Sequence, residues 1–396
     1  YHRDLHLSLR RQRQMCIRDR HTGVPEQYRG VVFACDWTFG RVMAVSPPGP
    51  RMSGLPEPIE FMTGRGHFGF APTDIAIGPD GSLFVAVGGR GTRGSVYRVT
   101  HPASTRSSLP RRETPMGTCL GAAQPLASWS RSRWLPLARK LGAAAFHAVI
   151  LDAEYTVPRR VRAVEILVDL FGVPEFVELE KQLDGLPAAV RSRLAWAVGR
   201  GRPTHPDARL LSRFLADEDP RVGRAACEAL LGISGRWDWD TVESGLLTQL
   251  DSPDRRTRQA AASVVARMPE AAWRRIRSEV SRRSPRARVA VAQGGRAHVQ
   301  GVDRDALSVA LEVLTTKNSQ QVSEGLKLDA ARLAQLALGD VGPVRGRAAV
   351  FDGYGALLPP AALSPVAGEV SRVIDSVFPS GSRELDDELA LSLIHI

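Results

Sequence analysis

The chain has 396 residues, and its 53 Lys and Arg against 42 Asp and Glu give a formal net charge of +11 at pH 7. This length is ample for two domains with cores of their own, and four cysteines exclude a small disulfide-stapled scaffold. The basic excess is modest and carried mostly by Arg, so we expect no nucleic-acid partner. No apolar run is long enough to predict a transmembrane segment.

Both ends of the chain match translated sequencing-adapter DNA. Residues 10–19, RRQRQMCIRD, are encoded by one frame of a common library adapter, and residues 391–396, LSLIHI, by the reverse complement of the transposon end. A basic arm that binds nucleic acid is the alternative for the first segment. Because both termini match, we expect residues 1–20 and 391–396 to be adapter-derived and not native, and residues 21–390 to be a fragment of a longer gene product.

Residues 21–100 have the pattern of β-strands. Short runs rich in Val, Ile, Phe and Tyr alternate with Gly, Pro and Asp, as in RGVVFAC, GRVMAVSP, PIEFM, TDIAIGP, SLFVAVGG and GSVYRVT. Gly78-Pro79-Asp80-Gly81 predicts a hairpin turn, since Pro presets φ and Gly accepts a positive φ. Evenly spaced strands without helices are typical of a sandwich, barrel or propeller. About four strands make a propeller blade, so in a propeller this stretch would supply one to two blades and no closed ring.

The hydrophobic pattern changes after this region. Residues 101–130 are rich in Pro, Ser, Thr and Gly and have no period, which predicts a linker. Residues 131–390 have a helical period: in VRAVEILVDLFG, apolar side chains recur at steps of three and four, at Val161, Val164, Val168 and Phe171.

A repeat runs through the helical region. Segments that begin at Pro and continue with Arg, Ala and Val recur at intervals of 29, 33, 33 and 32 residues, and another lies 58 residues further on, at Pro158, Pro187, Pro220, Pro253, Pro285 and Pro343. Such a period predicts an α-solenoid of helix pairs. The string Asp219-Pro220-x-Val222-x-Arg224-x-Ala226 is similar to the signature of HEAT repeats, and the aromatic-and-glycine pattern of tetratricopeptide repeats is not found. We expect HEAT-like pairs whose inward-facing residues include Val161, Val190, Val222 and Ala226.

No pattern in the sequence identifies a catalytic, cofactor-binding or metal-ligating residue. The GxGxxG strings at 64–69 and 89–94 lie between expected strands, where a dinucleotide site requires a following helix. Three aspartates at strand ends are expected to cap turns, and four histidines and a WDWD string at 237–240 lack ligand spacing; these residues are Asp36, Asp74, Asp80, His67, His147, His205 and His298.

Two stretches carry a resemblance to a known family. Residues 28–42 and 70–100 resemble the final blades of the propeller of sugar (glucose/sorbosone) dehydrogenases. The order propeller, linker, helical repeats resembles large multidomain bacterial proteins of the membrane-bound-dehydrogenase or haem-binding type, in which HEAT repeats precede a c-type cytochrome. The resemblance implies haem c and a periplasmic or cell-envelope location for the parent protein. It does not carry pyrroloquinoline quinone binding over, because Ala71 and Thr73 stand where the family has arginines that contact this cofactor.

The sequence therefore leads to two expectations for function. The first is a fragment of an envelope-associated redox protein that is dehydrogenase-like and cytochrome-linked. In this protein the solenoid would be a connector, or a docking surface for a protein partner or a neighbouring redox domain. The alternative is a non-catalytic HEAT-repeat scaffold for protein interaction. Nucleic-acid binding through Arg on the repeat helices is a third, which a steep salt dependence would reveal.

Overall fold

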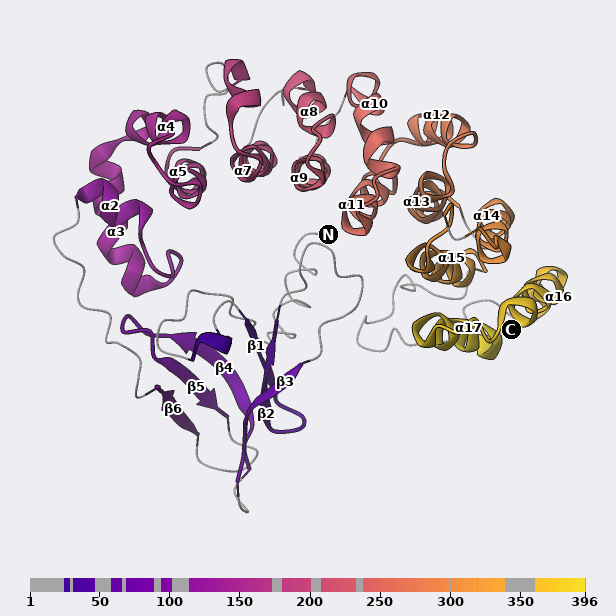
Figure 1. The fold of residues 1–396 in the computed structure, drawn as a ribbon, viewed down its shortest axis with the longest axis horizontal. Helices are drawn as coiled ribbons and strands as arrows, with labels where there is room; N and C mark the ends of the chain where they lie inside the picture. Colours follow the sequence, from indigo (N-terminus) through magenta and orange to yellow (C-terminus); the bar gives the residue numbers. More distant parts are fainter. Residues whose placement is uncertain are drawn as a thin grey trace. The chain divides into compact units, whose positions relative to one another are not determined.

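The structure is a computed structural model, and it describes residues 25–28, 31–46, 58–65, 69–88, 94–101, 114–172, 180–200, 208–232, 238–299, 301–318, 320–338 and 360–395. The chain divides into two compact units, Tyr1–Gly142 and Ala143–Ile396. The described part of the chain is mostly helical, with two small antiparallel sheets in the first unit (Figure 1).

Each sheet of the first unit has three strands in sequence order. They follow a short 3₁₀ helix at Glu26–Tyr28, and the strands are β1 (Val32–Asp36), β2 (Arg41–Val45) and β3 (Ile59–Thr63) in one sheet and β4 (Pro72–Ile77), β5 (Leu83–Val87) and β6 (Ser95–Val99) in the other. Alternate residues are buried along β1, β2 and β5, as the period of a half-buried strand requires. Phe33, Val42, Ile75 and Val85 belong to one core that both sheets share.

The hairpin predicted at Gly78–Gly81 is confirmed. It joins the antiparallel strands β4 and β5, and Asp80 accepts hydrogen bonds from the Ser82 backbone nitrogen (3.0 Å) and hydroxyl (2.8 Å). Gly81 has φ +79°, a conformation that favours glycine. Among the described residues neither sheet has the four strands of a propeller blade. The β content is thus confirmed, and the incomplete β-propeller stays a prediction.

The structure differs from the expected linker at 101–130. Helix α2 (Pro115–Leu120) and the first turn of α3 (Ser128–Leu141) lie within it, and the two helices pack on each other. The residues that suggested a linker instead form caps: the Thr114 hydroxyl accepts a hydrogen bond from the Gly117 nitrogen (3.1 Å), and Pro115 opens α2. The Trp134 indole is buried and donates to the Pro125 carbonyl (2.9 Å). Residues 114–130 are therefore folded.

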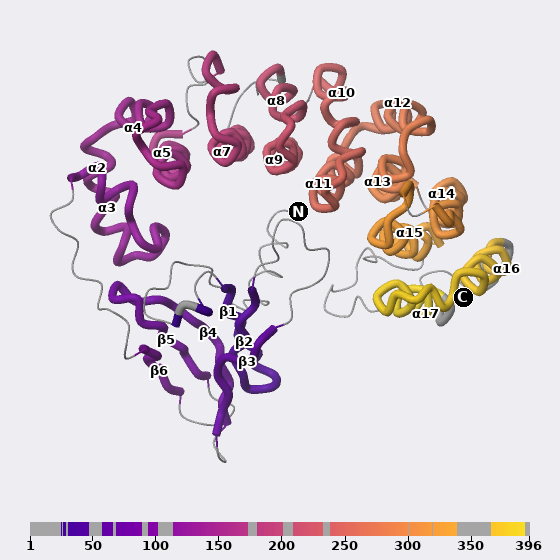
Figure 2. Tube along the Cα trace, viewed as in Figure 1, coloured from indigo at the N-terminus to yellow at the C-terminus, as the bar shows by residue number. Residues whose placement is uncertain are grey.

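The second unit is a series of helices. In chain order these are α4 (Ala143–Leu151), α5 (Val157–Leu170), α7 (Ala188–Val198), α8 (Ala208–Leu215), α9 (Pro220–Gly232), α10 (Trp239–Leu250), α11 (Arg255–Val265), α12 (Glu270–Val280), α13 (Pro285–Gly295), α14 (Arg304–Thr315), α15 (Glu324–Ala337), α16 (Pro360–Val377) and α17 (Arg383–His395), with 3₁₀ turns at Leu183–Gly185 and Arg296–His298. Figure 2 follows the Cα trace through them in order.

Helices that are not consecutive in the chain pack on one another. Each of α7, α9 and α11 contacts the next odd-numbered helix, and α8, α10 and α12 form a second series that packs in the same way (Figure 1). Polar contacts recur at about the repeat length: the Thr257 hydroxyl donates to the Pro220 carbonyl 37 residues away (3.0 Å), and Arg267 donates to the Leu231 carbonyl 36 residues away (3.0 Å). This nearest-neighbour packing confirms an α-solenoid.

The repeat prolines mark helix starts, as predicted. Pro158 lies in the first turn of α5, Pro187 directly precedes α7, and Pro220 and Pro285 are the first residues of α9 and α13. Pro253 lies in the turn before α11. Pro343 lies outside the described residues.

The predicted inward face is correct for α7 and α9 but not for α5. Val190, Val222 and Ala226 are fully buried, whereas Val161 is only half-buried. The apolar buried side chains of α5 are Ala163, Val164, Ile166 and Leu167. Of the predicted stripe only Val164 is fully buried, and Arg160 on the same face also points inward: this Arg is buried, and its Nε donates to the Ile150 carbonyl (2.8 Å).

Helix α17, the last helix of the described residues, packs on α15. Leu385 and Leu389 are buried in the core they share with α15, and the Gln335 amide donates to the Ser392 hydroxyl (3.1 Å). Residues 391–395 prolong α17, whereas residues 1–20 lie outside the described residues. The adapter origin of both ends stays a prediction.

Candidate functional site

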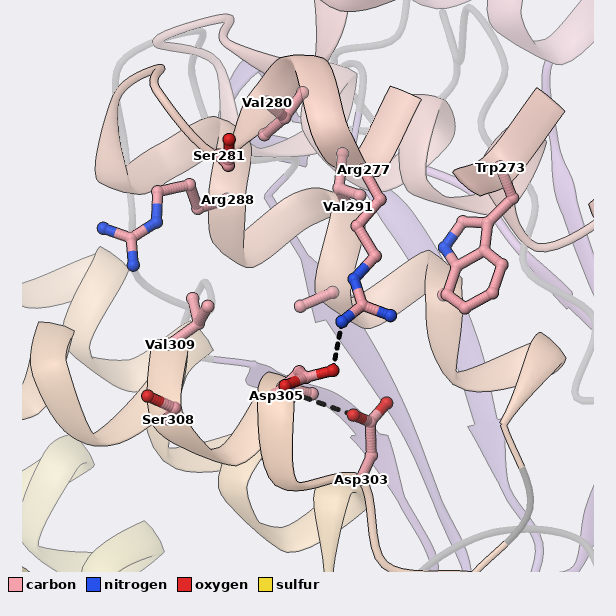
Figure 3. Close-up of a pocket in the computed structure, with 13 residues that line it drawn as sticks. Trp273, Arg277, Val280, Ser281, Arg288, Val291, Asp303, Asp305, Ser308 and Val309 are labelled. Carbon is pink, nitrogen blue, oxygen red and sulfur yellow. Dashed lines mark hydrogen bonds and ion pairs between the residues drawn. The ribbon is translucent and has the colours of Figure 1, made fainter. Parts of the chain in front are cut away.

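A pocket opens between helices α12, α13 and α14 (Figure 3). Its volume is about 260 Å³, and it is lined by Trp273, Arg277, Val280, Ser281, Arg288, Val291, Ala292, Gly295, Asp303, Asp305, Ala306, Ser308 and Val309. The lining thus combines an apolar wall with two arginines and two aspartates.

Within the part of the chain that the structure describes, no helix is long and apolar enough to cross a membrane.

Trp273 forms a fixed wall of the pocket. It lies on the buried face of α12 with Ile276 and Val280, at steps of three and four. Its indole stacks on the His298 ring, with centroids 4.8 Å apart and planes 16° apart. Gly295 leaves room for it, because a Cβ atom there would lie 2.7 Å from the indole nitrogen. The stacked His298 ring and the close approach of Gly295 therefore hold the indole in one orientation.

Arg277 links α12 to α14 across the pocket. Its Cζ atom lies 5.5 Å from the centroid of the Trp273 ring, close enough for a cation–π contact. Its Nη2 donates to the Asp305 carboxylate, as the dashed line in Figure 3 marks. Asp303 lies beside them at the start of α14, where its Oδ1 accepts a hydrogen bond from the Ala306 nitrogen (3.0 Å) and caps the helix.

The second arginine of the pocket, Arg288, is more firmly paired. Its Nη1 and Nη2 donate to the two carboxylate oxygens of Glu312, at 2.7 and 2.5 Å. These hydrogen bonds lower the pKa of Glu312 below its ordinary value and raise the pKa of Arg288. This forked pair connects α13 to α14 and holds the Arg288 guanidinium at the edge of the pocket.

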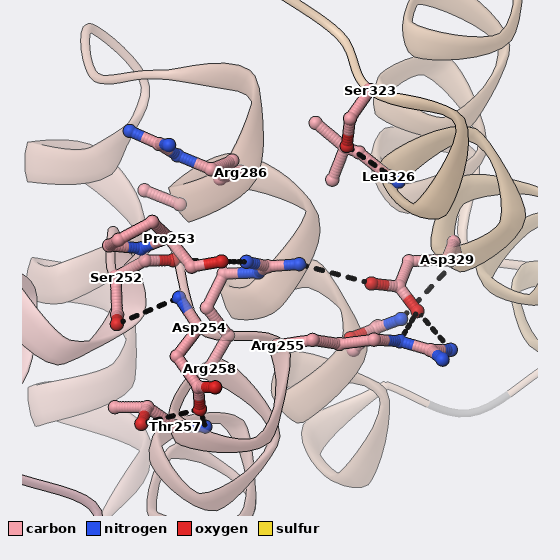
Figure 4. A network of polar contacts seen from close by, with 12 residues as sticks. Ser252, Pro253, Asp254, Arg255, Thr257, Arg258, Arg286, Ser323, Leu326 and Asp329 are labelled. Atoms are coloured by element: carbon pink, nitrogen blue, oxygen red, sulfur yellow. Dashed lines mark hydrogen bonds and ion pairs between the residues drawn. The ribbon is translucent and has the colours of Figure 1, made fainter. Parts of the chain in front are cut away.

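A separate polar cluster ties α11 to α15 (Figure 4). Asp329 accepts hydrogen bonds from Arg255 (2.8 Å) and Arg258 (3.3 Å), and Arg258 also donates to the carbonyls of Ser252 and Pro253. Arg258 and Asp329 are only 7% and 5% exposed. Burial lowers the pKa of Arg258, and the Asp329 charge opposes that effect. Because every charge has a protein partner, this cluster is a structural cross-link between repeats.

The aspartates singled out in the sequence serve the local backbone. Asp36 accepts from the Phe39 nitrogen (3.2 Å) and from Arg41 Nε (2.9 Å), and these hydrogen bonds lower its pKa. Asp80 makes the hairpin turn described above, and Asp74 accepts from the Ile75 nitrogen (2.7 Å). Thr73, one of the two residues that replace the family's arginines, donates to the Ala86 carbonyl (3.3 Å).

The remaining candidates from the sequence are the histidines, the WDWD string and the two GxGxxG strings, and the structure describes only some of their residues. Of the histidines, His298 reaches the pocket wall and contacts the Val265 carbonyl through Nε2 (2.9 Å), and His147 lies in α4. In the WDWD string, Asp238 precedes α10 and accepts from the Thr241 hydroxyl, and Asp240 pairs with Arg275. Outside the described residues lie all or part of both GxGxxG strings and Trp237, His67 and His205.

Where the structure describes them, the thiols and possible metal ligands give no second site. Cys35, Cys119 and Cys227 are buried, and burial raises the pKa of the Cys227 thiol far above its ordinary value. In the ranges that the structure describes, no group of three or more His, Cys, Asp or Glu side chains is arranged to hold a metal ion.

The pocket was missed by sequence reasoning. Its residues come from three helices, and no spacing along the chain brings Trp273 and Asp305 together. The available signal was weak: Trp273, Arg277 and Val280 follow one face of α12, a pattern that equally well describes an ordinary buried stripe.

No protein-family model matches the chain, and no curated protein matches it. Among solved structures, two engineered proteins are 18% and 15% identical; the alignments cover 72% and 67% of this chain and 96% and 70% of theirs, with TM-scores of 0.26 and 0.30. A designed armadillo repeat protein is 11% identical over 64% of this chain and 99% of its own, with a TM-score of 0.25. The assignment of the second unit as an α-solenoid rests on the contacts between its own repeats.

Proposed function

We propose that the second unit is a non-catalytic, HEAT-like scaffold that binds a protein partner through the pocket between α12, α13 and α14. One observation carries this proposal: a preorganised pocket with a buried Trp wall and two arginines opens within a stack of repeats. Stacked repeats generally serve as binding surfaces, and Trp and Arg are enriched among the residues that contribute most to protein interfaces.

The pocket is large enough to hold side chains of a partner. Pockets for drug-sized ligands occupy roughly 300–1,000 Å³, and this one has about 260 Å³. Such a volume suits one or two side chains of a partner. Because Trp273 and Arg288 are already held by His298 and Glu312, little side-chain entropy would be lost when a partner binds.

Panning a random-peptide display library on the purified chain tests this function. We expect enriched peptides that bind the wild-type chain and lose binding to Ser308→Trp, which places an indole in the pocket. Ser244→Trp is the matched control, since Ser244 is an exposed residue of α10 that does not line the pocket. No enrichment, or enriched peptides that bind both variants equally, would contradict the proposal.

The redox role of a longer parent protein, with haem c and a periplasmic or cell-envelope location, has only the family resemblance in its favour. The incomplete propeller belongs to the same proposal. Haem staining of the product expressed from the unfragmented gene tests it, and a product without haem would leave the scaffold as the function.

A further inference from the structure

We infer that the pocket between α12, α13 and α14 selects an acidic partner segment, in which a carboxylate next to an apolar side chain binds Arg277 while the apolar side chain packs on Ala292 and Val309. This inference rests on the proposed scaffold function and names the chemistry of its partner. Figure 3 shows the Arg277 guanidinium between the Trp273 ring and Asp305.

Arg277 has unused hydrogen-bond donors. A guanidinium carries five N–H donors in a fixed fork. Among the described residues, Arg277 donates only through Nη2, to Asp305. Its remaining donors can therefore bind a second acceptor, and a carboxylate is the acceptor that matches the fork best.

The present partner of Arg277 is easily replaced. The side chains of Arg277 and Asp305 are 44% and 72% exposed, and ion pairs this exposed contribute little to stability. Arg288 differs, since its side chain is only 23% exposed and two of its nitrogens are bound to Glu312. Arg277 is thus the arginine that a partner's carboxylate can engage.

The Trp273 ring keeps Arg277 in place when Asp305 gives way. The guanidinium lies over the ring, and an arginine held in this manner retains its orientation without its carboxylate partner. The accessible wall beside it is apolar and is formed by Ala292 and Val309, which cover the buried Val280 and Val291. An anionic group next to an apolar side chain complements the free donors of Arg277 and the wall beside it.

Defined peptide pools test the inference on the full chain. The probes are fluorescein-labelled peptides, blocked at both ends, with random flanks around a fixed Glu-Leu, Gln-Leu or Lys-Leu pair, and binding is read as fluorescence anisotropy. We expect the wild-type chain to bind the Glu-Leu pool about tenfold more tightly than the Gln-Leu pool, as the loss of one charge-assisted hydrogen bond implies, and the Lys-Leu pool most weakly.

Two variants separate recognition from a structural role. Arg277→Gln and Asp305→Asn break the same ion pair, so a purely structural effect would change binding in the same direction for both. We expect Arg277→Gln to abolish the preference for Glu-Leu, and Asp305→Asn to strengthen Glu-Leu binding because a competing carboxylate is gone. Arg275→Gln is the control on the same helix, since Arg275 pairs with Asp240 and Glu243 of α10. Arg277→Lys, which keeps the charge without the fork, replaces Arg277→Gln if that variant does not fold.

Each other outcome overturns a stated part. Equal binding of the three pools, a preference for Lys-Leu, or weaker Glu-Leu binding to both Arg277→Gln and Asp305→Asn would overturn the inference and leave the scaffold, because a peptide still binds. Binding of no pool, together with no enriched peptide from the display library, would overturn both.

Discussion

Single residues in this solenoid differ mainly in how far their charges are removed from water. Asp329 is buried and holds Arg255 and Arg258, whereas Asp305 is largely exposed and, among the residues that the structure describes, pairs only with Arg277. A buried charge that loses its partner has no water to replace it, so its desolvation cost remains in full. The same chemical pair is thus a cross-link in one place and an exchangeable contact in the other.

Substitution of the two aspartates should separate these roles. Asp329→Ala leaves the Arg258 guanidinium buried without its carboxylate, and we expect the free energy of unfolding to fall by about 3–5 kcal/mol. Asp305→Ala removes an exposed partner and should cost no more than about 1 kcal/mol. Urea denaturation followed by far-UV circular dichroism measures both. Equal losses would show that the Asp329 cluster does not cross-link α11 to α15.

At the scale of helices, the sequence predicted what one helix determines by itself and missed what several helices determine together. Proline positions located the starts of α9 and α13 because a first-turn Pro acts locally. The inward face of α5 was wrong because Arg160 is buried against a carbonyl of α4, a contact that hydrophobic period does not register. Helix α2 was missed because Pro and Thr are typical of linkers in a sequence, whereas in the structure Thr114 caps the helix.

The candidate pocket shows the same limit. Trp273, Gly295 and Asp305 lie on different helices, and their proximity depends on how α12, α13 and α14 pack. Gly295 is needed so that Trp273 can pack close to α13. The sequence cannot distinguish such a glycine from a helical glycine that has empty space around it.

Two glycines test this dependence on packing. In Gly295→Ala the new methyl group would lie 2.7 Å from the Trp273 nitrogen, so the indole must shift, and we expect a loss of about 1–3 kcal/mol in stability together with weaker peptide binding. Gly325→Ala in α15 meets nothing within 4 Å and should instead stabilise the chain by about 0.4–1 kcal/mol, since Ala restricts the unfolded chain. Thermal denaturation compares the two. A stabilising Gly295→Ala would mean that the indole does not depend on this glycine.

At the scale of the whole molecule, the two units differ in how their contacts are distributed. Both sheets of the first unit share one core, so every strand there depends on the others. In the second unit the helices α7, α9, α11 and α13 each contact their neighbours in the series, and stability is then close to a sum of repeat and interface contributions. Local damage should spread only as far as the adjoining repeats.

Hydrogen exchange after a single core truncation tests this localisation. Leu194 on α7 is fully buried, and Leu194→Ala should cost its repeat about 2–5 kcal/mol through lost contacts and the cavity that remains. We expect faster amide exchange in α7 and in its partners α5 and α9, while α14 and α15, which pack on each other several repeats away, keep their protection. Equal loss of protection from α5 to α15 would mean that the second unit opens as one cooperative body. In that case a partner bound at the α12–α14 pocket would stabilise every repeat and not only those beside it.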